Sequence, residues 1–347
     1  MNLEIRKTTT HVGIIDIITM ENDFGMKVVL INYGAALFKL MLKNSQGIYE
    51  NMVVAPDDLE TFLKSSFYYG KTVGRTSGRL VVPSYQIDEQ SFIVRPYRAG
   101  LTSLHGGRTG FSFRSFKVID EKKEPSYASV KMRYQSKHLE EDYPGNLTLD
   151  VTYCLDNEMN LTVIYEATTD QDTLCNITNH TYFNLNPSRE PITNHNLQIH
   201  ASKYLDIDQN HIIHDVKQTN QSPFDFKKIK SLMSGIKHMK KTSFNGFDHT
   251  WILDDHEANV DVIRLYSSLS DVGMRVYTSY PSVVIYTHNH VAPDVLKDTR
   301  NDGIHSALTL ECQFEPGGIH DEELNSAILR KGETYHHFIR FQMDRKI

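Results

Sequence analysis

The segment Leu147–Thr168, LTLDVTYCLDNEMNLTVIYEAT, carries the pattern that decides the fold class. Apolar and polar residues alternate from Leu147 to Leu155 and again from Leu161 to Thr168. Because successive side chains of a strand point to opposite faces, a period of two predicts two half-buried strands. The polar stretch DNEMN at 156–160 is rich in residues that tolerate turn conformations, so the whole segment predicts a β-hairpin.

Similar short β-rich runs recur along the rest of the chain at irregular intervals. They lie at residues 27–31, 91–94, 129–134, 196–200, 275–280, 282–287, 307–314 and 337–343. Helical spacing is rarer, and it predicts two short surface helices, one over residues 57–63 behind an Asp cap and one over residues 226–236 after Asp225. No linker and no fixed repeat divides the chain. We therefore expect one all-β domain over residues 1–347, a sandwich or barrel with a few short helices.

Charge and cysteine content exclude several classes of protein. The 37 Lys and Arg residues against 43 Asp and Glu residues give a net charge of −6, so no overall positive field exists to hold a nucleic acid. The three cysteines form no CxxC pair, and an odd, sparse set argues against a disulfide framework. The N-terminal residues contain no apolar signal segment, and no stretch is apolar enough to span a membrane. These features predict a soluble protein in a reducing compartment, the cytoplasm.

The segment Ile177–Leu185, ITNHTYFNL, places polar residues where a strand normally carries apolar ones. If it forms one strand, His180, Tyr182 and Asn184 share a face and make a hydrogen-bonding surface with an aromatic backing. Such a surface would suit a polyhydroxylated ligand. The alternative is that His180 is a hydrogen-bonded interior histidine with only a structural role.

A second candidate group is Glu311, in the middle of the apolar stretch LTLECQF at 308–314. Desolvation would raise the pKa of this carboxyl and hydrogen-bond donors would lower it, a balance typical of a general base. The alternative is an exposed strand face on which Glu311 meets water. The neighbouring Cys312 has no basic residue beside it in sequence and is expected to fill the core.

Three further segments combine polar residues with glycine: GRTSGR at 74–79, LHGG at 104–107 and NGFDHTW at 245–251. None has the spacing of a phosphate-binding loop. In the last segment, Asp248 beside Trp251 could meet a sugar, although a turn next to a core Trp is the commoner explanation. The 17 histidines contain no H-E-x-x-H motif or other ligand spacing, so no metal site is expected.

Together these segments closely resemble, in order, the motifs of the aldose 1-epimerases, or galactose mutarotases. The match covers nearly the whole chain and rests on six motifs: GRTSGR at 74–79, LHGG at 104–107, DYPGNL at 142–147, TNHTYFNL at 178–185, GFDH at 246–249 and LECQ at 310–313. The resemblance implies a large antiparallel β-sandwich of the supersandwich type with an open sugar cleft. It also implies an isomerase that needs no cofactor and interconverts the α and β anomers of a free hexose such as galactose or glucose.

The resemblance also implies roles for individual residues. Glu311 would be the general base on the C1 hydroxyl, His180 the general acid on the ring oxygen, and His105 would assist at the ring oxygen. Arg79 and Asp248 would hold sugar hydroxyls. Tyr182 and Asn184 are expected to bind the sugar as well, because strand alternation places them on the same face as His180. Two departures bear on sugar preference: Gly78 stands where many members have Asn, and Val284 stands where many have Gln.

Two other classes of function stay open at the level of sequence. A carbohydrate-binding relative without activity would keep the cleft, but the presence of both His180 and Glu311 argues against it. A hexose-phosphate epimerase or a glycoside-cleaving enzyme could use a related sandwich, and hydrolysis would require Asp248 to join Glu311 as an acid and base pair. The partner expected in each case is a small carbohydrate, and no protein partner is indicated.

Overall fold

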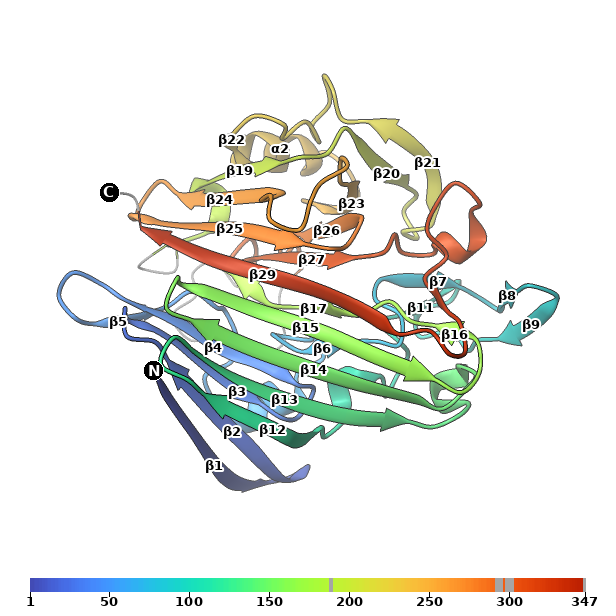
Figure 1. Ribbon diagram of the computed structural model, residues 1–347. Coiled ribbons are helices and arrows are strands. Elements are labelled where there is room, and N and C mark those ends of the chain that lie inside the picture. Colours follow the sequence, from blue (N-terminus) through green and yellow to red (C-terminus); the bar gives the residue numbers. More distant parts are fainter. Residues whose placement is uncertain (187–189, 291–295, 297–302, 346–347) are drawn as a thin grey trace.

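The computed structural model describes residues 1–186, 190–290, 296 and 303–345. Most of its strands belong to three antiparallel sheets of nine, six and five strands, which is the all-β sandwich expected from the sequence (Figure 1). Small two- and three-stranded sheets fill the edges between them. None of the helices in the described ranges is long and apolar enough to cross a membrane.

The nine-stranded sheet is built around the predicted hairpin. Leu155 pairs with Leu161 across the turn, which confirms that the alternating segment forms two adjacent strands. In sheet order the strands are β12 (Lys117–Lys123), β13 (Tyr127–Ser136), β14 (Leu147–Asp156), β15 (Asn160–Thr169), β29 (Tyr335–Arg345), β25 (Val272–Thr278), β24 (Ile263–Ser267), β19 (His195–Ile199) and β22 (Lys230–Ser231). Strand β29, the one furthest along the chain, therefore lies in the interior of the sheet between β15 and β25.

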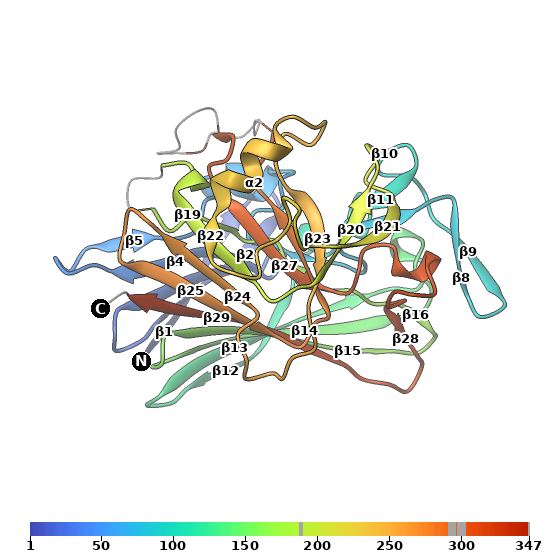
Figure 2. The same ribbon diagram turned by 90° about the horizontal axis from the view of Figure 1, so that it is seen from above.

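The six-stranded sheet packs over the nine-stranded sheet (Figure 2). In order its strands are β18 (Tyr182–Phe183), β27 (Leu308–Gln313), β26 (Ser282–Tyr286), β23 (Asp248–Ile252), β20 (Lys203–Ile207) and β21 (Ile213–Gln218). Every second residue of β27, such as Leu310 and Cys312, points into the core between the two sheets. There these side chains pack with residues of the nine-stranded sheet such as Val163 and Phe341. Because side chains alternate along a strand, Glu311 must point to the opposite, open face of this sheet.

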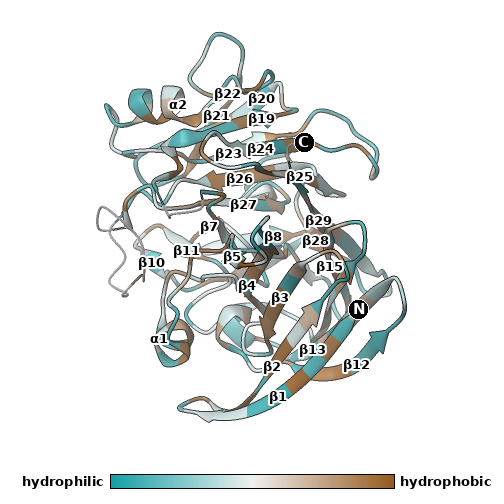
Figure 3. Cartoon of the chain, turned by 90° about the vertical axis from the view of Figure 1, so that its left-hand side faces the viewer, coloured by the Kyte–Doolittle hydropathy of each residue, from teal (hydrophilic) through white to brown (hydrophobic). Residues whose placement is uncertain are grey.

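The five-stranded sheet contains the first part of the chain. Its strands are β1 (Asn2–Thr10), β2 (Gly13–Glu21), β3 (Met26–Ile31), β4 (Ala36–Lys43) and β5 (Tyr49–Asn51). Hydrophilic and hydrophobic segments alternate along the edge strand β1 (Figure 3). Buried residues of β3 and β4, such as Val28 and Leu40, join the same hydrophobic cluster as the nine-stranded sheet.

The short elements connect these sheets. The small sheets are β7 (Arg79–Val81) with β11 (Thr102–Leu104) and β10 (Arg98–Ala99), β6 (Thr72–Val73) with β17 (Thr178–Asn179), β8 (Ser84–Ile87) with β9 (Gln90–Ile93), and β16 (Thr173–Leu174) with β28 (Ile328–Leu329). The 3₁₀-helices include Phe111–Phe113, Glu140–Asp142, Ile192–Asn194 and Gly318–His320.

The first predicted helix is confirmed and the second is shorter than expected. Helix α1 (Leu59–Lys64) begins behind Asp58, whose side chain accepts a hydrogen bond from the backbone N–H of Thr61. Helix α2 (Leu232–Met239) begins six residues after Phe226. The residues before Leu232 do not form a helix, because Phe226 packs into the core and Lys230–Ser231 pair with β19.

The prediction of one continuous strand over Ile177–Leu185 is wrong. The segment forms two short strands, β17 and β18, which pair with different partners, β6 and β27. The break occurs at His180, whose N–H donates to the carbonyl of Lys71 and whose carbonyl accepts from the N–H of Gly70. Gly70 and Lys71 directly precede β6, so His180 is still held on the side of β6, and the chain changes its partner to β27 at Tyr182.

Candidate active site

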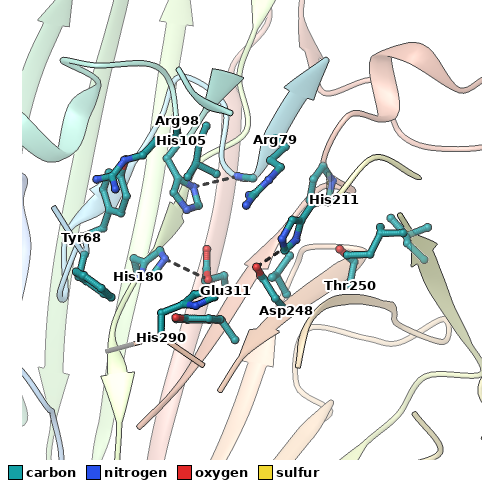
Figure 4. A pocket seen from close by; sticks show the side chains of 18 of the residues that line it. Tyr68, Arg79, Arg98, His105, His180, His211, Asp248, Thr250, His290 and Glu311 are labelled. Atoms are coloured by element: carbon teal, nitrogen blue, oxygen red, sulfur yellow. Dashed lines mark hydrogen bonds and ion pairs between the residues drawn. The ribbon is translucent and has the colours of Figure 1, made fainter. Parts of the chain in front are cut away.

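A cavity of about 240 Å³ lies over the open face of the six-stranded sheet. The structure brings six of the seven predicted site residues to its wall. They are Arg79, His105, His180, Tyr182, Asp248 and Glu311. Figure 4 shows five of these six side chains by name, with His180 directed at Glu311.

Glu311 is a buried carboxyl in the middle of β27. Its side chain is 3% exposed, which excludes the alternative of a solvated strand face. The Thr309 hydroxyl, on the same face of the strand, donates a 2.8 Å hydrogen bond to Oε1 of Glu311. Burial nevertheless dominates and raises the pKa of Glu311 to about 8. At neutral pH the carboxyl is therefore mostly protonated.

His180 lies directly beside this carboxyl. Its Nε2 is 3.4 Å from Oε1 of Glu311, and its side chain is 5% exposed. Burial lowers the pKa of His180 to about 4, because the low-dielectric surroundings disfavour the charged imidazolium. The imidazole is therefore neutral at neutral pH, in contact with a group that carries a proton.

The two pKa shifts have a joint consequence for the pair. A neutral Glu311 beside a neutral His180 contains the same number of protons as a carboxylate beside an imidazolium. Transfer of one proton across the 3.4 Å contact converts the first arrangement into the second without exchange with solvent. The pair therefore holds one mobile proton between pH values of about 4 and about 8, and its two ionisations belong to the pair as a whole.

His105 approaches the pair from the loop after β11. Its ring centroid is 5.1 Å from that of His180. Its Nδ1 accepts a 3.2 Å hydrogen bond from the N–H of Gly78, so the neutral ring carries its proton on Nε2. Burial holds the pKa of His105 well below its usual range, which keeps the ring neutral. His105 is therefore a fixed hydrogen-bond donor next to the acid and base pair.

These three residues also form a group that a metal ion could use in principle. One ligand atom from each of His105, His180 and Glu311 lies within 4.8 Å of the others. A metal at Nε2 of His105 would require the proton to move to Nδ1, where it would face the N–H of Gly78. Within the described part of the chain, Nδ1 of His180 finds no hydrogen-bond partner that would orient the ring for a metal. The donor set thus fits a metal poorly and fits proton transfer well.

Asp248 and Arg79 lie at a more open part of the pocket. Asp248 is at the start of β23, and its carboxylate lies 3.2 Å from Nδ1 of His211. Arg79 begins β7 and is opposite Leu104 in the neighbouring strand, so its position is tied to that of His105. Both side chains line the cavity and offer charged groups to hydroxyls of a ligand.

The buried side chain of Arg75 anchors the loop that carries Gly78 and Arg79. Arg75 is 2% exposed, and its guanidinium donates to the carbonyl oxygens of Pro144, Gly145 and Ser136. The motif GRTSGR is thereby fastened to the motif DYPGNL.

Asn184 is the predicted site residue that the structure does not bring to the cavity. Its amide donates to the carbonyl oxygens of Glu190 and Ser306, and its side chain is fully buried. Strand β18 ends at Phe183, so the alternation assumed for a continuous strand does not extend to residue 184. We therefore withdraw the assignment of Asn184 to sugar binding.

Trp251 also lies away from the cavity. Its ring is fully buried in the core, and its indole N–H donates to the carbonyl of Phe224. The structural explanation for this Trp is thus confirmed. Conversely, sequence reasoning missed the pocket residues Tyr68, Arg98, His211 and His290, which lie in loops or at the ends of short strands without a recognisable local pattern.

Comparisons with known proteins give a consistent result. The family described as Aldose 1-epimerase matches residues 16–342. The galactose mutarotase of Homo sapiens is 31% identical over 335 residues, covering 95% of this chain and 94% of that protein. The aldose 1-epimerase of Escherichia coli (strain K12) is 28% identical over 331 residues, 94% of each chain. The solved structure of galactose 1-epimerase from Lactobacillus acidophilus NCFM superposes with a TM-score of 0.87 and 29% identity, over 100% of both chains.

Proposed function

Because this chain belongs to the aldose 1-epimerase family and is an isomerase that interconverts the anomers of an aldose, we propose that Glu311 and His180 exchange the two protons of the reaction. The observation that carries this assignment is the 3.4 Å contact between two buried groups whose pKa values are shifted in opposite directions. Such pairs are typical of general acid and base catalysis.

The reaction begins from the ionised form of the pair. The Glu311 carboxylate removes the proton of the C1 hydroxyl as the C1–O5 bond breaks, and the electrons of the O–H bond form the C1 carbonyl. The ring oxygen takes a proton from the His180 imidazolium. Glu311 is then protonated, His180 is neutral, and the substrate is the open-chain aldehyde.

Rotation about the C1–C2 bond presents the other face of the carbonyl. Ring closure reverses both transfers, since Glu311 now donates a proton to O1 and His180 accepts one from O5. No electrons are gained or lost by the protein. The Nε2–H of His105 donates a hydrogen bond to the ring oxygen, where charge changes during the reaction. The hydrogen bond from the N–H of Gly78 to Nδ1 fixes the tautomer that makes this possible.

The remaining pocket residues bind the sugar. We assign hydroxyl contacts to Arg79 and Asp248, whose charged groups face the cavity, and a packing surface to the ring of Tyr182. Several relatives are named galactose mutarotase, so we propose galactose as the first sugar to assay. We further propose that the protein acts in the cytoplasm, which the free cysteines Cys154, Cys175 and Cys312 support.

The direct test is the change in optical rotation of freshly dissolved α-D-galactose and α-D-glucose. The protein should speed the approach to the anomeric equilibrium without altering the final rotation. A preparation that is folded by circular dichroism and leaves both rates at the spontaneous value would refute the proposal. Release of new reducing ends from a glycoside would indicate hydrolysis instead.

A further inference from the structure

The wall of the cavity carries more positive than negative charge. The described residues that line it include two arginines, Arg79 and Arg98, and two acidic residues, Asp248 and Glu311. Glu311 shares one proton with the neighbouring His180, so this pair adds no net charge near neutral pH. Two guanidinium groups therefore face a single lining carboxylate, although the chain as a whole has a net charge of −6.

Arg98 is the lining arginine to which the proposed mechanism gives no role. Its Nη2 donates a 2.9 Å hydrogen bond to the carbonyl of Ser66, and its Cζ lies 5.9 Å and 5.6 Å from the ring centroids of Tyr68 and Tyr97. Cation–π contacts at these distances hold the guanidinium at the cavity wall. Among the described residues, no carboxylate forms an ion pair with Arg98. Because a guanidinium has five N–H donors, several stay available to a ligand.

The backbone of Arg98 adopts an uncommon conformation. Its φ is +74°, in the left-handed region that residues other than glycine rarely occupy. Arg98 begins β10 opposite Ser103 of β11, and the next residue of β11, Leu104, lies opposite Arg79. This small sheet therefore brings both arginines to the same wall of the cavity. A sparsely populated backbone conformation beside an active site is typical of a residue with a function there.

The proposed mechanism indicates which part of the sugar lies near Arg98. His180 and His105 act at the ring oxygen O5, and the ring centroid of Tyr68 is 5.7 Å and 4.8 Å from those of the two imidazoles. Figure 4 shows Arg98 and Tyr68 on one side of these imidazoles and Asp248 on the other. The exocyclic carbon C6 is bonded to C5, a direct neighbour of O5, so it stays close to the groups that hold O5. A negative charge on C6 would thus lie near the Arg98 guanidinium.

We propose that Arg98 recognises a negative charge on the C6 substituent of the aldose, so that the pocket prefers a hexuronate or a hexose 6-phosphate to the neutral hexose. This inference rests on the proposed function of Glu311 and His180. A guanidinium binds carboxylate or phosphate oxygens through parallel, charge-assisted hydrogen bonds. The hydroxymethyl group of a neutral hexose has one oxygen and no charge. An anionic substrate would also balance the excess positive charge of the lining residues.

The test compares kcat/KM for D-galacturonate, D-galactose 6-phosphate, D-galacturonamide and D-galactose by polarimetry at neutral pH. Each value is divided by the spontaneous rate of the same sugar, so that intrinsic reactivity cancels. We expect at least one of the two anionic sugars to exceed galactose by about tenfold or more, as a charge-assisted hydrogen bond would provide. Galacturonamide has nearly the shape of galacturonate without its charge and should stay within about threefold of galactose. The preferred anion tells whether the charge comes from a carboxylate or a phosphate.

Three variants assign the preference to one side chain. Arg98→Gln removes the charge and should lower the ratio of the preferred anion to galactose by about tenfold or more. Arg98→Lys retains the charge without the guanidinium fork and should keep a larger part of the ratio than Arg98→Gln does. Arg108→Gln is the matched control, because Arg108 also lies over Tyr97, at 5.8 Å, but is exposed outside the cavity lining. It should leave the ratio unchanged, and circular dichroism verifies the folding of all three.

The outcomes separate the inference from the proposed function. If the unaltered protein accelerates galactose but prefers neither anion by more than about threefold, the inference is overturned and the epimerase assignment stays intact. That measurement needs no variant, so it is decisive even if Arg98→Gln fails to fold. A folded Arg98→Gln protein with an unchanged ratio would also overturn the inference, and so would an equal loss in Arg108→Gln. Absence of any acceleration with all of these sugars would instead remove the proposed function.

Discussion

The two ends of the pocket differ in their exposure to solvent. At one end, His180 and Glu311 are no more than 5% exposed, and each has the other as its nearest ionisable neighbour. At the other end, Asp248 and His211 keep 25% and 21% of their side-chain surface exposed, and the carboxylate of Asp248 lies 3.2 Å from Nδ1 of His211. Burial at the first end raises the pKa of Glu311 and lowers that of His180, so the pair retains one proton. The second end is more open to water and offers polar groups to a ligand.

The largest expected effect is at the buried end. Glu311→Gln retains the shape and loses the base, and His180→Asn retains a polar group and loses the titratable ring. Each variant should lose at least about 10²-fold in kcat, because general acid and base steps typically contribute 10²–10⁴-fold. Since both groups act in one proton exchange, the double variant should be far less impaired than the product of the single losses.

Polarimetry gives kcat for the three variants, and circular dichroism verifies their folding. A folded Glu311→Gln protein with more than about a tenth of the normal rate would end the assignment, because a lost base should cost at least 10²-fold. It would also remove the distinction between the two ends of the pocket.

At the exposed end we expect losses in binding. Arg79→Ala and Asp248→Ala remove charge-assisted hydrogen bonds worth about 1.5–3 kcal/mol, which corresponds to a rise in KM of about 10- to 150-fold. A smaller fall in kcat is expected where the sugar is less well placed. Initial rates over a range of galactose concentrations separate the two parameters. Unchanged KM in both variants would mean that neither side chain touches the sugar.

The pH profile connects the two ends. Only the pair with one proton is active, so kcat/KM should be highest between about pH 4 and pH 8 and fall about tenfold per pH unit outside that range. The charge of Asp248 contributes to the raised pKa of Glu311, so Asp248→Asn should move the alkaline limb to lower pH. The position of the limb is independent of the weaker binding. A limb that stays in place would show that the two ends are electrostatically uncoupled.

A moderate effect is expected on stability. The pKa of Glu311 is higher in the folded protein, about 8, than the 4.5 of an unperturbed Glu. Such a group favours the folded state fully below pH 4.5, and this contribution is lost as the pH rises to about 8. Glu311→Gln removes the titration, so its melting temperature relative to the unaltered protein should rise by on the order of 5 °C between pH 4 and pH 9.

Thermal melts at the two pH values measure this difference. The exposed residue Glu124 supplies a control, because Glu124→Gln should give the same difference at both pH values. A Glu311→Gln protein that shows no pH-dependent gain would contradict the buried, neutral carboxyl.

No effect is expected from metal removal. Dialysis against a strong chelator should leave the polarimetric rate unchanged, because the tautomer of His105 disfavours a metal at the buried end. A loss restored only by a divalent ion would contradict the proton-transfer mechanism.

Much of the fold follows from local patterns in the sequence. The alternation in Leu147–Leu155 was sufficient to predict a hairpin, because both strands bury one face in a large sheet. The same alternation indicates Glu311 as a site residue, because it is a charged residue in an otherwise apolar strand and its side chain must point to the face opposite that of Leu310 and Cys312. The Asp58 cap of α1 depends only on contacts within four residues. Each of these predictions relies on short-range geometry.

The rest depended on contacts between distant segments. At His180 the chain changes from pairing with β6 to pairing with β27, and both partners lie more than a hundred residues away in the chain. The contact between His180 and Glu311 joins the segment between β17 and β18 to the middle of β27. His211 sits in the turn between β20 and β21 and reaches Asp248 only after β23 packs beside β20. No local pattern in the sequence contains this information.

The place of β29 within the nine-stranded sheet affects how the chain is made. Synthesis proceeds from the N-terminus at roughly 5–20 residues per second, so residues 335–345 leave the ribosome after every other strand of that sheet. Until then β15 and β25 each present an unpaired edge, which is open to pairing with other chains. We expect nascent chains to depend on chaperones until β29 emerges, and chains shortened before Tyr335 to aggregate rather than to form a smaller active protein.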